Sequence, residues 1–248
     1  MNRIETEPAI WKKKKRIAWI CAFSFLLVLA GIFTFIKIGP QKDGTSSIFR
    51  YGFMANEKLW HALQSKKISL ERTVPSGKKP RVNGTIGLRT ELPEGDYKIQ
   101  VVQDELKESF GLGTILVLPK TSHSTEFRCI EGWSEDMQYA GIRFSDFMSE
   151  KNLGKKKDGT YYSYVGLETP DGKYYVSIDM ESMLHPQTLL AWEMNGKPLS
   201  RYNGHPLRLM IPIKYGIKSL KRVGKIIFSD ERPRDYWAER GYDWYSGL

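Results

Sequence analysis

An uninterrupted run of twenty uncharged residues, from Ile17 to Ile36, constrains this chain more than any other feature. As a helix the run would rise about 30 Å, which matches the hydrocarbon thickness of a bilayer. A buried core helix is the alternative, but such helices seldom extend this far without a polar face. A cleaved signal peptide has a shorter apolar region followed by small residues, whereas this run continues into Lys37 and Ile38. We therefore expect an uncleaved transmembrane helix over residues 17–38.

Charged residues on the two sides of this run predict its orientation. Five consecutive basic residues, Lys12 to Arg16, precede it, and only Lys37 and Lys42 follow closely. Because the side richer in Lys and Arg stays in the cytoplasm, we expect the large C-terminal part on the periplasmic side. The expected organisation is a basic cytoplasmic tail (1–16), a transmembrane anchor (17–38), a linker with a short amphipathic helix (39–79) and a folded domain (80–248).

The net charge of +10 does not indicate nucleic-acid binding. Half of it belongs to residues 1–37, in or next to the expected membrane span. A nucleic-acid-binding protein usually concentrates basic residues in a stripe or on a recognisable module, and neither is visible in the remaining sequence. We therefore expect no nucleic-acid partner and interpret the other charges as a solvated surface.

Short alternating or β-branched segments dominate the part after the linker, in no βαβ order, which predicts an α+β fold with a β-rich mixed sheet. A Pro-Asp-Gly turn at 170–172 and an Asn-Gly pair at 195–196 predict two hairpins. The expected helices are Asn56–Lys67, Phe144–Lys151 and Pro233–Arg240, with a basic loop over Pro75–Lys79. The expected strands are Tyr97–Val102, Thr114–Leu118, Thr125–Ile130, Tyr161–Leu167, Tyr174–Ile178, Leu189–Met194, Lys197–Leu199, Leu207–Ile213 and Val223–Phe228.

The two cysteines of the chain do not form a disulfide framework, because Cys21 lies within the apolar run and Cys129 in the folded part. Composition alone leaves three roles for Cys129, namely a small buried apolar residue, a nucleophile or a metal ligand, and favours the first. A zinc site is disfavoured, since no second cysteine or paired histidine spacing accompanies it.

Four ordered motifs and a familiar ending change this interpretation. The segment FRCIEGWS (Phe127–Ser134) resembles the molybdenum-ligating cysteine segment of the sulfite oxidase family. The segments HPQTLLA (His185–Ala191), NGHPLRL (Asn203–Leu209) and YGIKSLK (Tyr215–Lys221) resemble later motifs of that family in the same order, and so does the ending DYWAERGY (Asp235–Tyr242). The resemblance extends from about Pro80 to Leu248, and it implies an oxidoreductase of the sulfite oxidase molybdopterin-binding type.

The resemblance implies a role for each matching residue. Cys129 would be the molybdenum ligand, and a soft thiolate suits a metal already held by two pterin sulfurs. Arg208, Lys218, Ser219 and Lys221 would supply donors and positive charge for the pterin phosphate. Thr169 is the match to a pterin-contacting threonine, with a plain turn residue as the alternative. Trp133 and Tyr236 would line the pocket, although core packing explains an aromatic residue equally well. The expected cofactor contacts are Arg81, Asn83, Thr169, Asn203, Arg208, Ser219, Leu220 and Lys221.

The sequence departs from the sulfite oxidases directly after the cysteine. Those enzymes place arginines there to hold an anionic substrate, whereas Ile130 to Ser134 contains none. The segment is closer to the periplasmic methionine-sulfoxide reductase catalytic subunits, whose pattern is C-x-E-x-W-S. We therefore expect two-electron oxygen-atom transfer on a sulfoxide-type or other small oxo substrate. Lys15-Arg16 stands in place of the family's usual twin-arginine signal, so a cytoplasmic domain remains the alternative.

The expected redox partner follows from the cofactor-binding patterns that the sequence lacks. The sequence contains no haem or iron–sulfur ligand pattern, so we expect electrons to be exchanged with a separate redox protein, such as a cytochrome or a membrane haem subunit. The dimerisation domain of sulfite oxidases is missing, which favours a monomer. Two other hypotheses remain: a membrane-tethered binding module that retains the fold without metal, and a thiol hydrolase that pairs Cys129 with a histidine.

Overall fold

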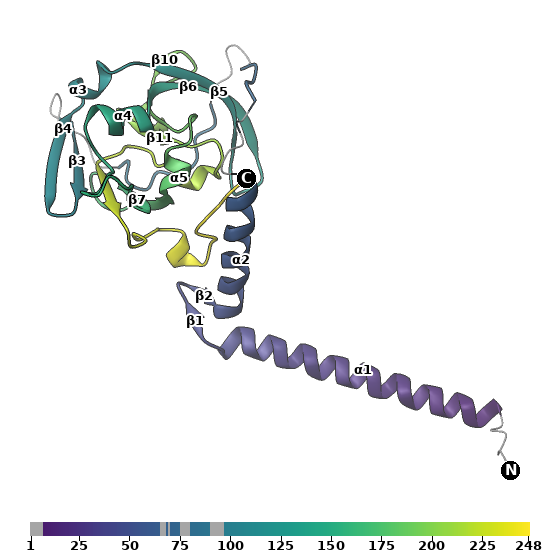
Figure 1. Ribbon diagram of the computed structural model, residues 1–248. Helices are drawn as coiled ribbons and strands as arrows, with labels where there is room; N and C mark the ends of the chain where they lie inside the picture. The colour runs from purple at the N-terminus through teal and green to yellow at the C-terminus, as the bar shows by residue number, and fades with distance from the viewer. Residues whose placement is uncertain (1–6, 65–67, 69, 75–79, 90–96) are drawn as a thin grey trace. The chain divides into compact units, whose positions relative to one another are not determined.

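The computed structural model describes residues 7–64, 68, 70–74, 80–89 and 97–248. The chain divides into two compact units, Met1–Gly52 and Phe53–Leu248, which are considered separately. Figure 1 shows the course of the chain. The basic loop expected at Pro75–Lys79 lies outside the described residues.

The first unit consists of a long helix, a small hairpin and the start of a second helix. Helix α1 (Glu7–Ile38) contains one stretch, Trp11–Ile38, that is long and apolar enough to cross a membrane, and its side chains are exposed. Strands β1 (Gln41–Lys42) and β2 (Thr45–Ser46) pair as a hairpin, and α2 (Ser47–Gln64) begins directly afterwards.

The hairpin brings the beginning of α2 next to the end of α1. The backbone N–H of Ser47 donates to the carbonyl of Pro40 at 2.9 Å, and the Ser47 hydroxyl donates to the same oxygen at 2.9 Å. Arg50 adds a bond from Nε to the carbonyl of Lys42 at 3.1 Å. Ser47 comes nine positions after Ile38, the last residue of α1. Its hydrogen bonds nevertheless hold it against Pro40, which comes only two positions after Ile38.

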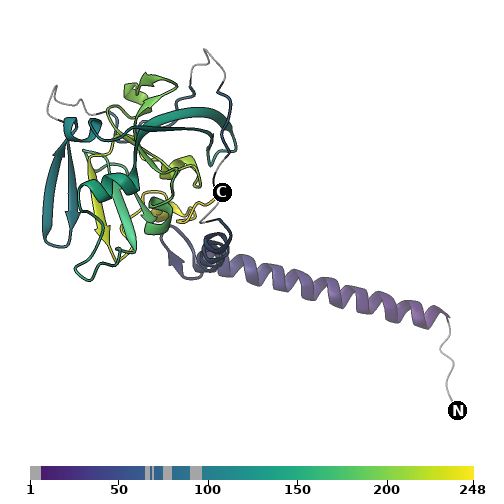
Figure 2. The same cartoon turned by 45° about the horizontal axis from the view of Figure 1, so that its top comes forward.

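Two five-stranded sheets form the body of the second unit. One has the order β4-β3-β12-β7-β8, in which β12 runs parallel to β3 and antiparallel to β7. The other has the order β10-β9-β6-β5, with β11 paired to β9. Figure 2 shows β5 and β6 as long curved neighbours at the edge of the second sheet. The first sheet contains β3 (Lys98–Gln103), β4 (Leu106–Gly111), β7 (Tyr164–Glu168), β8 (Tyr175–Asp179) and β12 (Lys225–Ser229), and the second contains β5 (Thr121–Arg128), β6 (Ser134–Arg143), β9 (Leu189–Met194), β10 (Lys197–Pro198) and β11 (Arg208–Met210).

Alternation along β9 divides the apolar residues between two clusters. Leu190 belongs to the main core, to which the first sheet contributes Val101 and Leu167. Leu189 and Ala191 point to the opposite face, as successive strand residues do, and join a smaller cluster with Tyr139 and other residues. The second sheet is therefore apolar on both faces, and the smaller cluster forms the floor of the cavity described below.

Helices and 3-10 turns connect the strands. The short elements are α3 (Gly113–Leu116), α4 (Phe144–Glu150), α5 (Met180–Met183), η1 (Arg201–Asn203), η2 (Gly216–Lys218) and η3 (Ala238–Arg240). The α+β class, the helix at Phe144 and both hairpins agree with the sequence predictions. Asn195 and Gly196 have φ values of 51° and 72°, as a two-residue turn of this kind requires.

Three local predictions were wrong. The strand expected at Thr114–Leu118 is the helical turn α3, because the Thr114 hydroxyl donates to the carbonyl of Gly111 and closes the turn while only Ile115 is buried. The C-terminal helix expected from Pro233 is reduced to η3, because the N–H of Tyr236 donates to the carbonyl of Tyr175 instead. Helix α2 begins at Ser47, nine residues before the expected start at Asn56.

Candidate active site

A cavity of about 340 Å³ opens into the second unit above the smaller apolar cluster. Its wall combines three cations, one carboxylate, one cysteine and several aromatic rings. Eight of the residues singled out from the sequence line it: Arg81, Asn83, Cys129, Trp133, Asn203, Arg208, Ser219 and Lys221. The fold therefore gathers segments that are separated by up to 140 positions in the sequence around one space.

Cys129 lies at the end of β5, in the tight turn that leads to β6. Its N–H donates to the carbonyl of Trp133 at 2.9 Å, and the N–H of Gly132 donates back to the carbonyl of Cys129 at 3.1 Å. The side chain is 7% exposed and contributes to the cavity wall. The turn thus holds the thiol where a group in the cavity can reach it while most of the residue is shielded from solvent.

A polar network links the thiol to one wall of the cavity. The Asn83 amide donates to Cys129 Sγ at 3.7 Å. Glu131 accepts a bond from Trp133 Nε1 at 3.2 Å, and the pKa of Glu131 is lowered by its hydrogen bonds to Asn83 and Trp133 and by the charge of Arg81. The Arg81 guanidinium lies 4.7 Å from the centre of the Trp133 ring. These contacts fix the indole beside the cysteine.

Arg208, on β11, brings a buried charge to the opposite wall. It donates to the carbonyls of Asn203 at 3.1 Å and Ser219 at 3.3 Å. Its guanidinium lies 5.1 Å from the centre of the Tyr139 ring. Burial raises the pKa of Tyr139, although the charge of Arg208 acts in the opposite direction. Arg208 forms no ion pair with a carboxylate in the described part of the chain, so its charge is stabilised only by dipoles and aromatic faces.

Lys221 is the third cation of the cavity and bridges to the loop that carries Asn83. Its Nζ donates to the carbonyls of Asn83 at 2.6 Å and Gly84 at 3.2 Å. Burial lowers the pKa of Lys221 to about 8, and Arg208 also lowers it, whereas Cys129 acts in the opposite direction. Like Arg208, it makes no ion pair within the described residues. A nearby anion would stabilise its charged form.

Two glycines allow these walls to approach each other. A side chain at Gly216 would meet the Phe127 ring at 2.3 Å, so η2 packs directly against the strand that carries the cysteine. Gly204 has a φ of 104°, and a Cβ there would lie 3.0 Å from Lys221 and 3.1 Å from Arg208. The glycines of the NGHPLRL and YGIKSLK motifs therefore serve close backbone approach at the cavity.

Lys218, from the same motif as Lys221, turns away from the cavity. It is 1% exposed, and its Nζ lies 2.5 Å from Asp235 Oδ2 and 3.1 Å from the carbonyl of Ser177. Asp235 also accepts bonds from the N–H groups of Ser177 and Ala238 at 3.0 Å. Lys218 therefore holds η2 in place from behind. The structure does not place it among the phosphate donors, where the sequence analysis had included it.

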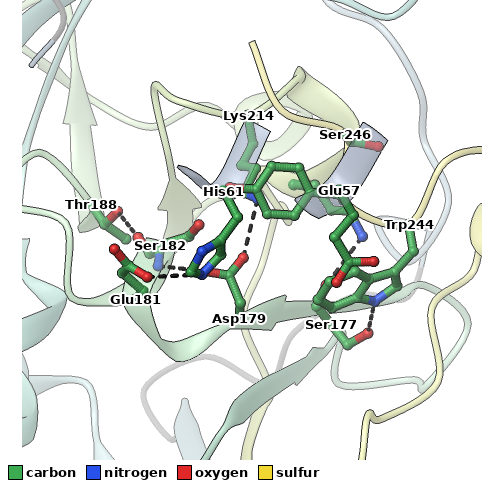
Figure 3. Close-up of polar contacts among 12 residues, drawn as sticks. Glu57, His61, Ser177, Asp179, Glu181, Ser182, Thr188, Lys214, Trp244 and Ser246 are labelled. Carbon is green, nitrogen blue, oxygen red and sulfur yellow. Dashed lines mark hydrogen bonds and ion pairs between the residues drawn. The ribbon is translucent and has the colours of Figure 1, made fainter. Parts of the chain in front are cut away.

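A second buried lysine, Lys214, is paired in a similar way. Its Nζ lies 3.1 Å from Asp179 Oδ2, as Figure 3 shows. Burial lowers the pKa of Lys214 to about 8, although the charge of Asp179 acts in the opposite direction. Close by, Trp244 Nε1 donates to the Ser177 hydroxyl at 2.6 Å and His61 lies 2.8 Å from Glu181 (Figure 3). This cluster ties the chain's last residues to β8, and α2 to α5.

Three residues singled out from the sequence lie outside the cavity wall. Leu220 is fully buried in the main core. Thr169 donates to Asp171 Oδ1 at 2.7 Å in the turn after β7 and packs against Gly87, where a Cβ would meet it at 2.4 Å. Tyr236 stacks against Tyr174, with ring centres 5.3 Å apart. Tyr236 therefore lies behind a ring that does line the cavity.

Sequence reasoning missed most of the apolar wall. The Phe127, Tyr139, Tyr174, Trp237 and Tyr242 rings line the cavity together with Met137, Met194, Ile86, Ile130 and Ile217. Five of these residues lie within the recognised motifs, so position in a motif could have indicated them: Phe127, Ile130, Ile217, Trp237 and Tyr242. The others have no local signal, because a ring at a cavity wall and a ring in a core follow the same strand pattern.

The residues present fit a metal–pterin group. One soft sulfur donor faces the cavity, and three cations outnumber the single carboxylate of its wall. No cluster of three or more His, Cys, Asp or Glu side chains suited to a metal occurs among the described residues, so Cys129 would be a lone protein ligand. None of the four histidines, all within the described part, lines the cavity. The thiol hydrolase hypothesis therefore lacks its base there.

In the part of the chain that the structure describes, one cysteine and two cations without a carboxylate partner line one cavity. Together with a fold of one mixed and one antiparallel sheet, they define the class of oxidoreductases that bind a metal–pterin cofactor. The comparison with protein families agrees. The family described as "Oxidoreductase molybdopterin binding domain" matches residues 88–237, more than half of the chain. The chain belongs to this family, and it is a molybdopterin-dependent oxidoreductase whose cofactor contains molybdenum.

Three relatives, all named as protein-methionine-sulfoxide reductase subunits, match part of this chain. The putative protein-methionine-sulfoxide reductase subunit YedZ1 of Azospira oryzae is 34% identical over 141 residues, covering 57% of this chain and 52% of the relative. The protein-methionine-sulfoxide reductase catalytic subunit MsrP of Campylobacter jejuni is 30% identical over 168 residues, covering 62% and 57%. MsrP of Xanthomonas axonopodis pv. citri is 35% identical over 123 residues, covering 45% and 38%. The chain thus spans about half the length of these relatives.

A solved structure supports the fold. The sulfane dehydrogenase SoxCD from Paracoccus pantotrophus matches with a TM-score of 0.50 and 22% identity, covering 58% of this chain and 40% of that chain. At this identity the match concerns the fold alone. Together with the family match it confirms the α+β fold of the sulfite oxidase molybdopterin-binding type.

Proposed function

We propose that this chain is the catalytic part of a membrane-anchored molybdenum enzyme that reduces a sulfoxide-type substrate. The observation that carries the proposal is the cavity itself, in which Cys129 faces the same space as Arg208 and Lys221. Cys129 would ligate the metal, while Arg208 and Lys221, together with Asn203 and Ser219, would bind the anionic end of the pterin. When bound, the cofactor supplies two-electron oxygen-atom transfer.

In the proposed reaction a sulfoxide takes up two electrons and two protons and yields a thioether and water. The chain provides position and shielding for this step. The aromatic and aliphatic wall excludes water and accommodates an apolar sulfur substituent. Relatives named as methionine-sulfoxide reductases, such as MsrP of Campylobacter jejuni, support this substrate class.

The balance of charge near Cys129 supports a neutral substrate. Arg81 is the cation nearest to the Trp133 side of the cavity, and it is stacked on that indole with Glu131 close by. The carboxylate offsets the guanidinium charge, so the entrance offers an anion no net attraction from this pair. Sulfite and similar anions would thus gain little binding energy from this pair, whereas the binding of an uncharged sulfoxide would not be weakened by it.

The electrons would come from a separate redox protein, a cytochrome or a membrane haem subunit. The chain contains no haem-attachment motif, and several relatives are themselves named as subunits. Helix α1 would keep the enzyme in the same membrane as its donor. The basic run Lys12–Arg16 favours a cytoplasmic N-terminus and a periplasmic catalytic domain.

Metal analysis of the full chain tests the metal-binding part of this proposal. Wild type and Cys129→Ser would be produced in a host that makes molybdopterin and purified in mild detergent. We expect stoichiometric molybdenum and sulfoxide reductase activity with an artificial electron donor in wild type, and loss of both in Cys129→Ser. Cys21→Ser, which changes the other cysteine, should match wild type. Metal-free wild type would support the binding-module hypothesis instead.

A further inference from the structure

One side of helix α2 exposes a stripe of apolar side chains. The residues Ile48, Tyr51, Ala55, Leu59 and Ala62 recur at helical spacing, and all are exposed, with Leu63 and Met54 beside them. Tyr51 and Leu63 expose 70% and 64% of their surface. Soluble helices normally show the reverse arrangement. We call this set of seven residues the outer face of α2.

The opposite side of α2 is attached to the second unit by polar contacts. His61 lies 2.8 Å from Glu181, and Glu57 accepts a bond from Arg232 at 2.7 Å. Asn56 donates to Asp243 at 3.3 Å. These contacts fix the rotation of the part of the helix after Gly52, so Leu59 and Leu63 cannot turn inward to bury their side chains.

The start of α2 lies beside the end of the membrane-spanning candidate. Ser47 is hydrogen-bonded to Pro40 at 2.9 Å, two residues after α1 ends. The apolar stretch Trp11–Ile38 contains 28 residues and, as a helix, extends about 42 Å, more than the hydrocarbon core needs. If α1 crosses a bilayer, its end reaches the headgroup region, and the first turn of α2 must lie there too.

We propose that the outer face of α2 lies in the headgroup region of the bilayer that α1 crosses and docks the second unit onto it. The inference rests on the proposed membrane anchor. An amphipathic helix in this position buries its apolar side at the boundary between headgroups and acyl chains. The apolar stripe, the fixed rotation of its second part and its start beside α1 all fit lipid.

Photo-crosslinking of the full chain tests the proposal. The photoreactive residue p-benzoylphenylalanine would replace Phe25 in α1, Leu59 on the outer face or Val117, which directly follows α3 and is exposed. Each protein would be reconstituted in vesicles of phosphatidylcholine and phosphatidylglycerol, irradiated and analysed by mass spectrometry. We expect lipid adducts at Phe25 and Leu59, at least about tenfold above Val117, since interfacial helices insert among acyl chains.

The three positions distinguish the possible failures. Adducts at Phe25 but only the Val117 level at Leu59 would overturn the docking while leaving the anchor in place. No adduct at Phe25 would overturn the anchor, and the docking with it. A crosslink from Leu59 to a second copy of the chain, or to another protein in native membranes, would assign the outer face to that occupant instead of lipid.

A charge variant provides an independent readout. With the photoreactive residue at Ala55, the double substitution Leu59→Glu and Leu63→Glu should reduce the lipid adduct about tenfold, because carboxylates resist burial among acyl chains. Leu106→Glu with Val117→Glu adds the same charges to exposed positions of the second unit and should leave the adduct unchanged. Equal molybdenum content in both variants would show that the fold is intact, and an undiminished adduct at Ala55 would contradict the proposal.

Discussion

The basic residues between positions 208 and 221 occupy two regions of the structure with opposite surroundings. Lys214 and Lys218 are buried and each lies against an aspartate, Asp179 and Asp235 respectively. Arg208 and Lys221 line the cavity, and within the described residues neither is paired with a carboxylate. The first two cations are neutralised by the protein itself, so their role is to hold η2 and the chain's last residues. Arg208 and Lys221 leave positive charge facing the cavity, which is the arrangement expected for binding an anion.

The comparison teaches that a basic motif does not by itself show which cations bind a ligand. Lys218 and Lys221 belong to one seven-residue motif, but Lys218 ends the 3-10 turn η2 and reaches Asp235, whereas Lys221 lies after the turn and lines the cavity. The carboxylate that neutralises Lys218 is seventeen positions away in the sequence. Substitutions in the two regions should therefore affect different properties.

The largest effect is expected from breaking the buried pair. Asp235→Ala leaves the Lys218 ammonium buried without its counterion, which should lower the free energy of unfolding by about 3–5 kcal/mol. Urea unfolding of the detergent-solubilised chain, followed by tryptophan fluorescence, measures it. The double variant Lys218→Met with Asp235→Leu should recover much of the loss. If Asp235→Ala were as stable as wild type, Lys218 would have another partner and the structural role assigned to it would be wrong.

A smaller effect on stability, but a large one on cofactor loading, is expected at Lys221. Lys221→Gln removes a charged donor from the cavity and should reduce the affinity for molybdopterin roughly tenfold to a hundredfold, because a hydrogen bond to a charged group contributes about 1.5–3 kcal/mol. Molybdenum content at limiting cofactor supply provides the measurement. Lys225→Gln, at the start of β12 and outside the cavity wall, is the matched control and should load normally.

The pH dependence of cofactor binding should follow the protonation of the Lys221 side chain. Its pKa of about 8 in the free protein is below the ordinary value of 10.5, so the side chain is charged below pH 8 and becomes neutral above it. A bound anion raises that pKa. Affinity should therefore be constant below pH 8 and then fall by at most about tenfold per pH unit, as the loss of one proton requires. Binding of molybdopterin to the apoprotein, followed by its absorbance, should show this fall in wild type and none in Lys221→Gln.

The smallest effect is expected at the entrance. Glu131→Gln removes the carboxylate beside Arg81 and Trp133 without removing a cation. Solvent weakens the effect of an exposed charge on an ionic ligand, so KM for an anionic substrate should fall only about threefold to fivefold. KM for a neutral sulfoxide should stay within error. A neutral sulfoxide affected as strongly as an anion would mean that Glu131 contacts the substrate itself.

Much of the fold was predictable because its signals are local. Alternation in β3, the turn residues of the β7–β8 and β9–β10 hairpins and the uncharged run of α1 can each be recognised within a short window. The failures at α3 and at the C-terminus have tertiary causes. Asp235 is drawn into the pair with Lys218, and the backbone of Tyr236 bonds to Tyr175, so the residues after Pro233 cannot form the expected helix.

The candidate site was predictable where motifs carried it and not elsewhere. Cys129, Asn203, Arg208 and Lys221 were identified by resemblance, and the structure brings them to one cavity. The direction of a side chain within a motif was not predictable, as Lys218 shows. The outer face of α2 was missed because the expected helix began at Asn56, which removed Ile48 and Tyr51 from the stripe.

X-ray absorption at the molybdenum edge tests the central claim most directly. The account predicts three sulfur neighbours of molybdenum in wild type, two from the pterin and one from Cys129. In Cys129→Ser, any molybdenum that remains should have two. An equal number of sulfur neighbours in both proteins would show that the metal does not bind Cys129, and the account of this cavity would be contradicted.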